Sequence, residues 1–102
     1  MPVVVLVDGE NVRRSRWPNL TPGELEDLVV RWASRTGRAA RVVWEGEKSA
    51  DDRIAEFATG LPRYWLVTSD RELRERAGTR AERVVGGGGF LRELVSERDV
   101  VP

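Results

Sequence analysis

Short runs of apolar, mostly β-branched residues recur along the chain, and segments with the 3.6-residue period of helices separate them. The runs are VVVLV at 3–7, AARVVWE at 39–45, YWLVTS at 64–69 and ERVVG at 82–86. The first run has no polar position, which is typical of a parallel strand that is covered on both faces. These runs predict four strands, with the first in the centre of a sheet.

Two helices are predicted from their starting sequences. Thr21 to Glu24 has the sequence of a capping box with proline at the first helical position, and apolar residues then recur at helical spacing until Gly37. Those apolar residues are Leu25, Leu28, Val29 and Trp32. Ser49 to Asp52 forms a second capping-box sequence, and the apolar face that follows contains Ile54, Phe57 and Ala58.

Two further helices are predicted in the last third of the chain. One begins at Asp70 and ends near Gly78, and the other is amphipathic, with Phe90, Leu91, Leu94 and Val95 on its apolar side. The glycines at 86–89 precede it and lack the lysine and the serine or threonine of a phosphate-binding P-loop. We therefore interpret them as a flexible joint between the last strand and the last helix.

The regular alternation of strand and helix predicts the fold class. It favours a small three-layer α/β/α domain of the Rossmann-like kind, with a four-stranded, mostly parallel sheet in the order 2-1-3-4. A chain of 102 residues fits one domain with one core, so residues 1–102 are expected to form a single domain.

Composition removes several classes of function. The chain has no cysteine and no histidine, which excludes disulfides, thiolate metal sites, serine–histidine triads and histidine-dependent catalysis. Its formal net charge is zero, so any binding of nucleic acid must be local. No apolar stretch reaches the length of a membrane span, and a cytoplasmic location without membrane contact is the resulting expectation.

Acidic residues follow the strands at the edge where parallel-sheet proteins bind ligands. Asp8 follows the first strand, Glu45, Glu47 and Asp51 follow the second, and Asp70 follows the third. Carboxylates that converge in this way repel one another and favour a bound cation, and oxygen ligands select Mg²⁺ or Mn²⁺. Each aspartate also has a purely structural interpretation, because acids are preferred at turns and at helix starts.

Three motifs at these strand ends resemble a known family. VDGENV (7–12), SADDRI (49–54) and LVTSDRELR (66–74), with GGFLREL (88–94) as a weaker fourth, are similar to the NYN branch of the PIN-like nuclease superfamily, and most of all to its YacP-type group. They occur in the family's order and extend over nearly the whole chain. The resemblance implies a PIN-like fold and a metal-dependent endoribonuclease.

The resemblance also implies roles for individual residues. Asp8, Asn11, Asp51 and Asp70 correspond to the catalytic positions, and the three aspartates among them to the ligands of Mg²⁺ or Mn²⁺. Further candidate ligands are Glu47, Asp52 and Glu72. The implied reaction is attack of metal-activated water on an RNA phosphodiester, which requires no histidine.

A basic and aromatic segment follows the first motif. Arg13, Arg14, Arg16 and Trp17, together with Arg71, are expected to grip phosphates and to stack an unpaired base, although a solvated loop rich in arginine would have the same composition. RNA is therefore the expected partner, either alone or within a ribosome or another RNA–protein complex. A homodimer that extends the binding groove is a further expectation.

Two other classes of function stay open at this level. A PIN-like module that binds RNA or a protein without cutting would have the same motifs. A small phosphatase-like or nucleotide-binding α/β domain would use the same edge of the sheet. Cleavage of RNA that depends on a divalent ion distinguishes the nuclease from both.

Overall fold

The computed structural model describes residues 1–99, with side chains through residue 96. The strands are β1 (Val4–Asp8), β2 (Ala39–Val43), β3 (Tyr64–Val67) and β4 (Arg83–Val85). The helices are α1 (Gly9–Arg13), α2 (Pro22–Thr36), α3 (Ala50–Gly60), α4 (Arg71–Ala77) and α5 (Gly87–Asp99). The predicted strands and the four predicted helices are thus all present.

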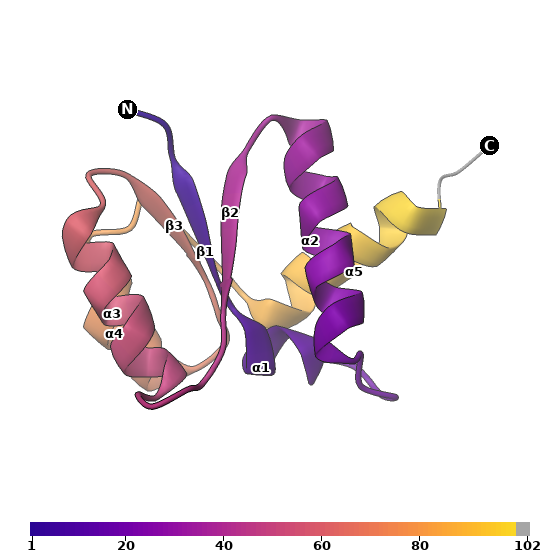
Figure 1. Ribbon diagram of the computed structural model, residues 1–102, viewed down its shortest axis with the longest axis horizontal. Coiled ribbons are helices and arrows are strands. Elements are labelled where there is room, and N and C mark those ends of the chain that lie inside the picture. Colours follow the sequence, from indigo (N-terminus) through magenta and orange to yellow (C-terminus); the bar gives the residue numbers. More distant parts are fainter. Residues whose placement is uncertain (100–102) are drawn as a thin grey trace.

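The strands form one sheet in the order β2-β1-β3-β4, and all of its pairs are parallel. Figure 1 shows α3 and α4 on one face of the sheet and α1, α2 and α5 on the other. The predicted three-layer architecture and strand order are confirmed. Because β1 lies between β2 and β3, the ends of these three strands are neighbours at one edge.

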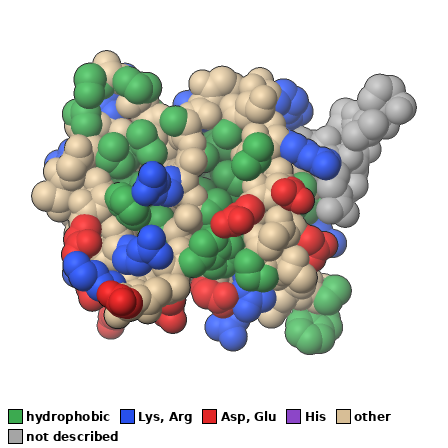
Figure 2. Space-filling view, in the orientation of Figure 1, with side chains coloured by type: hydrophobic (Ala, Val, Ile, Leu, Met, Phe, Trp, Pro, Cys, Tyr) green, Lys and Arg blue, Asp and Glu red, His purple; other side chains and the backbone are tan. Residues whose placement is uncertain are grey.

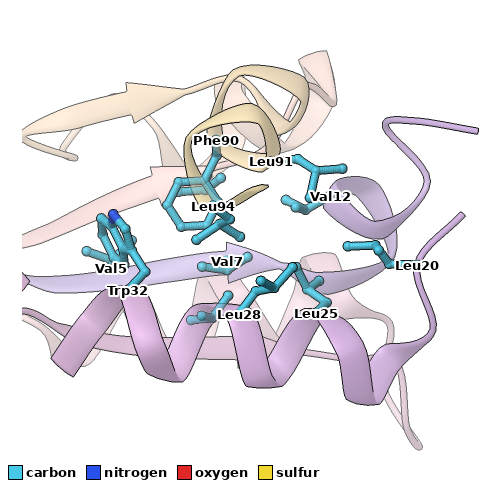
Figure 3. Packing of buried hydrophobic residues seen from close by; sticks show 12 residues of the cluster. Val5, Val7, Val12, Leu20, Leu25, Leu28, Trp32, Phe90, Leu91 and Leu94 are labelled. Atoms are coloured by element: carbon cyan, nitrogen blue, oxygen red, sulfur yellow. The ribbon is translucent and has the colours of Figure 1, made fainter. Parts of the chain in front are cut away.

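The unbroken apolar run of β1 is explained by burial on both faces. Val5 and Val7 pack into the cluster beneath α2 and α5, whereas Leu6 packs into the cluster beneath α3 and α4. All three side chains are fully buried. Figure 3 shows the first cluster, in which the Trp32 and Phe90 rings meet edge to face with centroids 5.0 Å apart. Burial of such side chains supplies most of the free energy that holds the layers together.

The helix starts follow the expected capping chemistry. Thr21 and Glu24 form a reciprocal capping box, and Gly37 ends α2 with a φ of 69°, a left-handed conformation that favours glycine. The Ser49 hydroxyl accepts a hydrogen bond from the backbone N–H of Asp52, so Ser49 caps α3. The Asp70 carboxylate accepts one from the N–H of Leu73 and caps α4. The caps at Ser49 and Asp70 set where α3 and α4 begin, and the acidic side chains at the edge of the sheet lie at these helix starts.

Two glycine segments differ from the prediction. Helix α1, which begins at Gly9 directly after β1, is not indicated by the sequence pattern. The prediction that Gly86–Gly89 form a flexible joint is wrong, because α5 starts at Gly87. Both glycines allow close packing. A Cβ atom at Gly9 would lie 2.6 Å from the Trp44 ring, and one at Gly87 would lie 2.4 Å from Asn11 Oδ1. Glycine here permits contact between elements rather than flexibility.

Candidate functional site

Asp8 is the buried centre of the candidate site. It is the last residue of β1, and only 6% of its surface is exposed. The Thr68 hydroxyl, which is fully buried just after β3, donates a hydrogen bond of 2.9 Å to Asp8 Oδ2. A buried carboxylate needs such a partner, because water cannot reach it freely. The ends of two neighbouring strands are therefore joined through side chains.

The same threonine positions Asp70. The backbone N–H of Asp70 donates to Thr68 Oγ1 at 3.1 Å, and Asp70 Oδ1 accepts from the N–H of Leu73. Thr68 thus links Asp8 to the start of α4. The backbone N–H of Asn11 also interacts with the Asp8 carboxylate and lowers its pKa.

Asn11 ties α1 to the loop after β3. Its Oδ1 atom accepts a hydrogen bond of 2.9 Å from the backbone N–H of Ser69, and Ser69 Oγ in turn accepts one of 2.8 Å from the N–H of Gly87. The side-chain amide N–H groups of Asn11 are left to donate elsewhere. This chain of contacts sets the first turn of α5 beside the acidic residues.

A cavity of about 390 Å³ collects these groups at the edge of the sheet. Asp51 enters it from the first turn of α3 and Glu45 from the segment after β2. The cavity is lined by Asp8, Glu10, Asn11, Arg14, Ser15, Glu45, Ala50, Asp51 and Asp70. All four residues that the motifs identify as catalytic positions therefore face one space.

The electrostatics of the cavity are those of crowded carboxylates. Burial raises the pKa of Asp8, and Asp51 and Asp70 raise it further, while the hydrogen bond from Thr68 lowers it. Burial and then the charge of Asp70 raise the pKa of Asp51, which the nearby Arg76 partly offsets. Like charges in a desolvated site disfavour ionisation, so a bound cation would be favourable here.

The oxygen donors of the cavity suit a hard divalent cation, although the three carboxylates are not arranged around a single point. Asp8, Asp51 and Asp70 offer the oxygen ligands that Mg²⁺ and Mn²⁺ prefer. Among the described side chains, which extend through residue 96, no group of three acidic residues is already arranged to hold a metal ion. Asp51 lies in the first turn of α3 and Asp70 caps α4, so binding of one ion by all three carboxylates would require these side chains to reorient.

The other candidate ligands lie outside this cavity. Asp52 accepts a salt bridge of 2.7 Å from Arg76, which lowers the pKa of Asp52. Glu47 and Glu72 are exposed, and neither lines the cavity, although Glu72 is near enough to raise the pKa of Asp51 slightly. The structure therefore brings together the three motif aspartates and leaves the three additional candidates at the periphery.

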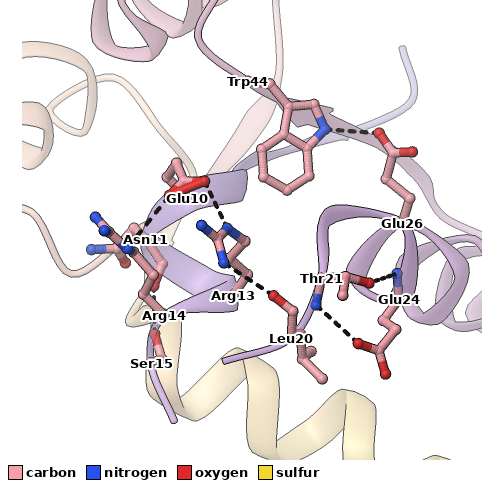
Figure 4. Close-up of polar contacts among 10 residues, drawn as sticks. All are labelled: Glu10, Asn11, Arg13, Arg14, Ser15, Leu20, Thr21, Glu24, Glu26 and Trp44. Atoms are coloured by element: carbon pink, nitrogen blue, oxygen red, sulfur yellow. Dashed lines mark hydrogen bonds and ion pairs between the residues drawn. The ribbon is translucent and has the colours of Figure 1, made fainter. Parts of the chain in front are cut away.

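The basic segment divides into anchored and exposed residues. Arg13 donates to Glu10 Oε1 at 2.6 Å and to the carbonyl of Leu20, so it braces the loop after α1 (Figure 4). Arg14 lies 3.5 Å from Glu10 and lines the acidic cavity. Arg16 and Arg71 are exposed, and Trp17 is 87% exposed. Arg13 is thus a structural contact, and the remaining residues of the segment are accessible to a ligand.

Several residues of the site were not anticipated from the sequence. Thr68 and Ser69 make the connecting hydrogen bonds, and Glu10 pairs with Arg13, which lowers the pKa of the Glu10 carboxyl. Thr68 and Ser69 both belong to the motif LVTSDRELR, so the sequence marked their segment as part of the site without indicating their hydrogen bonds. Glu10 lies within VDGENV, but its orientation depends on α1, which the pattern of apolar positions does not indicate.

The visible surface has no dominant charge. Figure 2 shows acidic and basic side chains interspersed over the face seen there, in keeping with a formal net charge of zero. In the part of the chain that the structure describes, no helix is long and apolar enough to cross a membrane. Attraction of a polyanion would therefore have to come from particular arginines near the cavity.

Comparison with known proteins identifies a structural neighbour. No protein-family profile matches the chain, and no curated protein matches it. Among solved structures, the chain is similar to a tryptophan-to-leucine mutant of Rae1 (YacP) from Bacillus subtilis, with 25% sequence identity and a TM-score of 0.76. The similarity covers 94% of this chain and 77% of that one. The chain therefore has a YacP-like fold.

Proposed function

We propose that this protein is a metal-dependent endoribonuclease of the NYN and PIN-like type, working on RNA in the cytoplasm. The observation that carries the proposal is the convergence of Asp8, Asp51 and Asp70 on one polar cavity at the ends of β1 and β3 and at the start of α3. The motif resemblance and the YacP-like fold support the same chemistry.

The three aspartates, which line one cavity, would hold Mg²⁺ or Mn²⁺ through their carboxylate oxygens. A bound ion of this kind supplies a nucleophilic water at neutral pH and neutralises charge that develops on a phosphate. Asp8 is the fixed member of the set, because Thr68 and burial hold its carboxylate in one orientation. Asp51 and Asp70 adjust around it.

Asn11 and Arg14 would serve the substrate rather than the ion. Asn11 Oδ1 is occupied by the Ser69 N–H, so its amide hydrogens are directed toward an acceptor, such as a phosphate oxygen. Arg14 lines the same cavity and is only loosely paired with Glu10 at 3.5 Å. Its guanidinium can leave that pair for a phosphate, which it can contact through two N–H groups.

One observation favours a second candidate, a PIN-like module that binds RNA without cutting it. No three of the acidic side chains that the structure describes are already arranged around a metal position. In such a module Asp51 and Asp70 would only stabilise the starts of their helices, and the phosphodiester would not be cleaved. The two functions differ in their response to metal.

The test is incubation of the purified protein with end-labelled RNA in Mn²⁺, in Mg²⁺ and in EDTA. The nuclease proposal predicts shortened products with either ion and none with EDTA. RNA that is bound but intact under every metal condition would favour the binding module, and cleavage that persists in EDTA would contradict both.

Metal binding can also be measured without catalysis. At about one hundred times its Kd, Mn²⁺ should stabilise the native protein by about 2.7 kcal/mol, or roughly 10 °C or more in melting temperature. Asp51→Asn should lose most of this shift, because Asp51 faces the cavity. Asp52→Asn is the matched control. Asp52 is the next residue in the chain, but its carboxylate pairs with Arg76, so this variant should keep the shift in melting temperature. Equal shifts in the two variants would argue against Asp51 as a ligand.

A further inference from the structure

A second and larger cavity lies beside the acidic one, between the segment after α1 and the outer side of α5. Its volume is about 700 Å³, within the range of pockets that hold small ligands. Its lining includes Ser15, Arg16, Leu91, Arg92, Val95 and Ser96. The motif resemblance assigns no role to the residues that α5 contributes, and the catalytic proposal does not use them.

The two cavities adjoin the same segment of the chain, which follows α1. Ser15 lines both of them, with Arg14 on the acidic side and Arg16 on the α5 side. Ser15 is held in place, because its hydroxyl donates a hydrogen bond of 2.7 Å to the Asn11 carbonyl. Figure 4 shows Ser15 just after α1, close to the start of α5. A chain-like ligand could therefore occupy both cavities at once.

The lining combines an apolar floor with two available cations. Leu91 is buried and Val95 half-buried, whereas Arg16 and Arg92 are exposed. Cβ atoms placed on Gly88 and Gly89 would each lie 3.7 Å from a guanidinium nitrogen of Arg92. The guanidinium thus extends along the first turn of α5, where the glycines place no side chain in its way.

Arg16 and Arg92 differ from several other arginines of this protein. Arg13, Arg63 and Arg76 each form a close ion pair with a carboxylate. Neither Arg16 nor Arg92 forms an ion pair with an acid of the described part of the chain. Two guanidinium groups without an acidic partner among the described side chains, at the rim of an apolar pocket, are complementary to a ligand with a flat apolar portion and negative charge.

We infer that this cavity binds an unpaired nucleotide of an RNA strand, next to the phosphodiester that enters the acidic cavity. The inference rests on the proposed function and extends it. The base would lie against Leu91 and Val95, and the phosphates would contact Arg16 and Arg92. A single strand satisfies both cavities, since it repeats a base and a phosphate at each step.

The test separates binding from cleavage. Affinity for a fluorescein-labelled single-stranded RNA is measured by anisotropy in EDTA, where metal-dependent cleavage does not occur. Arg92→Glu should raise Kd about tenfold, the loss expected for a charge-assisted contact. The matched control is Arg31→Glu, which makes the same charge change at an exposed position of α2 that lines neither cavity, and it should change Kd less than about twofold.

A double-mutant cycle adds a test of shared contact. Arg16→Glu should weaken binding to a similar degree, and the double variant should lose less than the product of the two separate losses, because both arginines hold one nucleotide. Circular dichroism of each variant establishes that it is folded. A Kd for folded Arg92→Glu within twofold of the wild-type value would overturn the inference, as would a wild-type protein that binds no RNA.

The outcomes also separate this inference from the catalytic proposal. Weakened RNA binding by Arg92→Glu, with no cleavage in any metal, would support the nucleotide site and refute the nuclease. Metal-dependent cleavage by the wild type, with an unchanged KM and Kd in Arg92→Glu, would support the nuclease and refute the nucleotide site.

Discussion

Replacing Asp8 with asparagine is expected to reduce RNA cleavage by about two orders of magnitude or more, and to make the protein more stable. The loss of cleavage follows from removal of the one carboxylate that burial and Thr68 hold fixed in the cavity. The gain in stability follows from the same burial. Asparagine has nearly the shape of aspartate and can accept the Thr68 hydrogen bond without carrying a charge.

The pH dependence of this effect has a definite sign. Burial, with a further contribution from Asp51 and Asp70, raises the pKa of Asp8 in the native state above that in the unfolded chain. The native state therefore binds the proton more tightly, and this contribution to stability is fully present in acid and is lost as the pH rises through the native pKa. The ionised Asp8 is destabilising at neutral pH, and Asp8→Asn removes that charge.

Thermal melts across pH, with no divalent ion present, test this account. The melting temperature of Asp8→Asn should exceed that of the wild type near pH 7, and the difference should close below about pH 4. In a domain of this size each kcal/mol corresponds to roughly 4–8 °C. Asp27→Asn, at an exposed position of α2, is the control and should leave the curve unchanged. A variant that is less stable at pH 7, or that cleaves RNA at the wild-type rate, would refute this role for Asp8.

Replacing Gly87 with alanine is expected to destabilise the protein by about 1–3 kcal/mol, the usual cost of forcing an extra methyl group into a packed site. The new Cβ would lie 2.4 Å from Asn11 Oδ1 and 3.0 Å from Ser15 Oγ. Asn11 cannot simply turn away, because its Oδ1 accepts the Ser69 N–H. The clash would therefore be relieved by moving α5 or by breaking that hydrogen bond, and RNA cleavage should fall as well.

Gly89→Ala provides a matched control in the same helix. A Cβ there would meet nothing closer than Arg92 at 3.7 Å, an ordinary contact, so loss of a helical glycine should stabilise the protein by about 0.5–1 kcal/mol. Urea denaturation of both variants measures the two free energies of unfolding, and equal m-values show that the comparison is sound. Stability changes of the same sign would mean that the first turn of α5 is not packed as described.

Most of the fold could be predicted from the sequence because its signals are local. The unbroken run at β1 encodes burial on both faces, and the capping sequence at Thr21 encodes the start of α2, so each signal is local and strong. The glycines of α5 were misassigned because glycine marks both flexible joints and close contacts. The partner that decides between them is Asn11, 76 positions away in the sequence, which only the folded chain brings near Gly87.

The candidate site was predictable only in part. Strand ends of a parallel sheet meet at one edge, so the convergence of Asp8, Asp51 and Asp70 follows from the strand order. Thr68 lies within the motif LVTSDRELR, but its role could not be inferred from the sequence, because it depends on reaching across from β3 to β1. The sequence indicated Arg16 as a phosphate contact, but it did not indicate the α5 cavity, since Arg92 is an ordinary exposed arginine in a chain that is rich in them.

The central claim is that the acidic cavity cuts RNA with the help of a divalent ion. Its most direct test compares the wild type with Asp70→Asn on labelled RNA in Mn²⁺, because asparagine is as good a helix cap as aspartate and should preserve α4. We expect the wild type to cleave the RNA and the equally folded variant to cleave it at least a hundredfold more slowly. Loss of a metal ligand is expected to lower the rate by about two orders of magnitude. Equal cleavage by the two proteins would contradict the central claim.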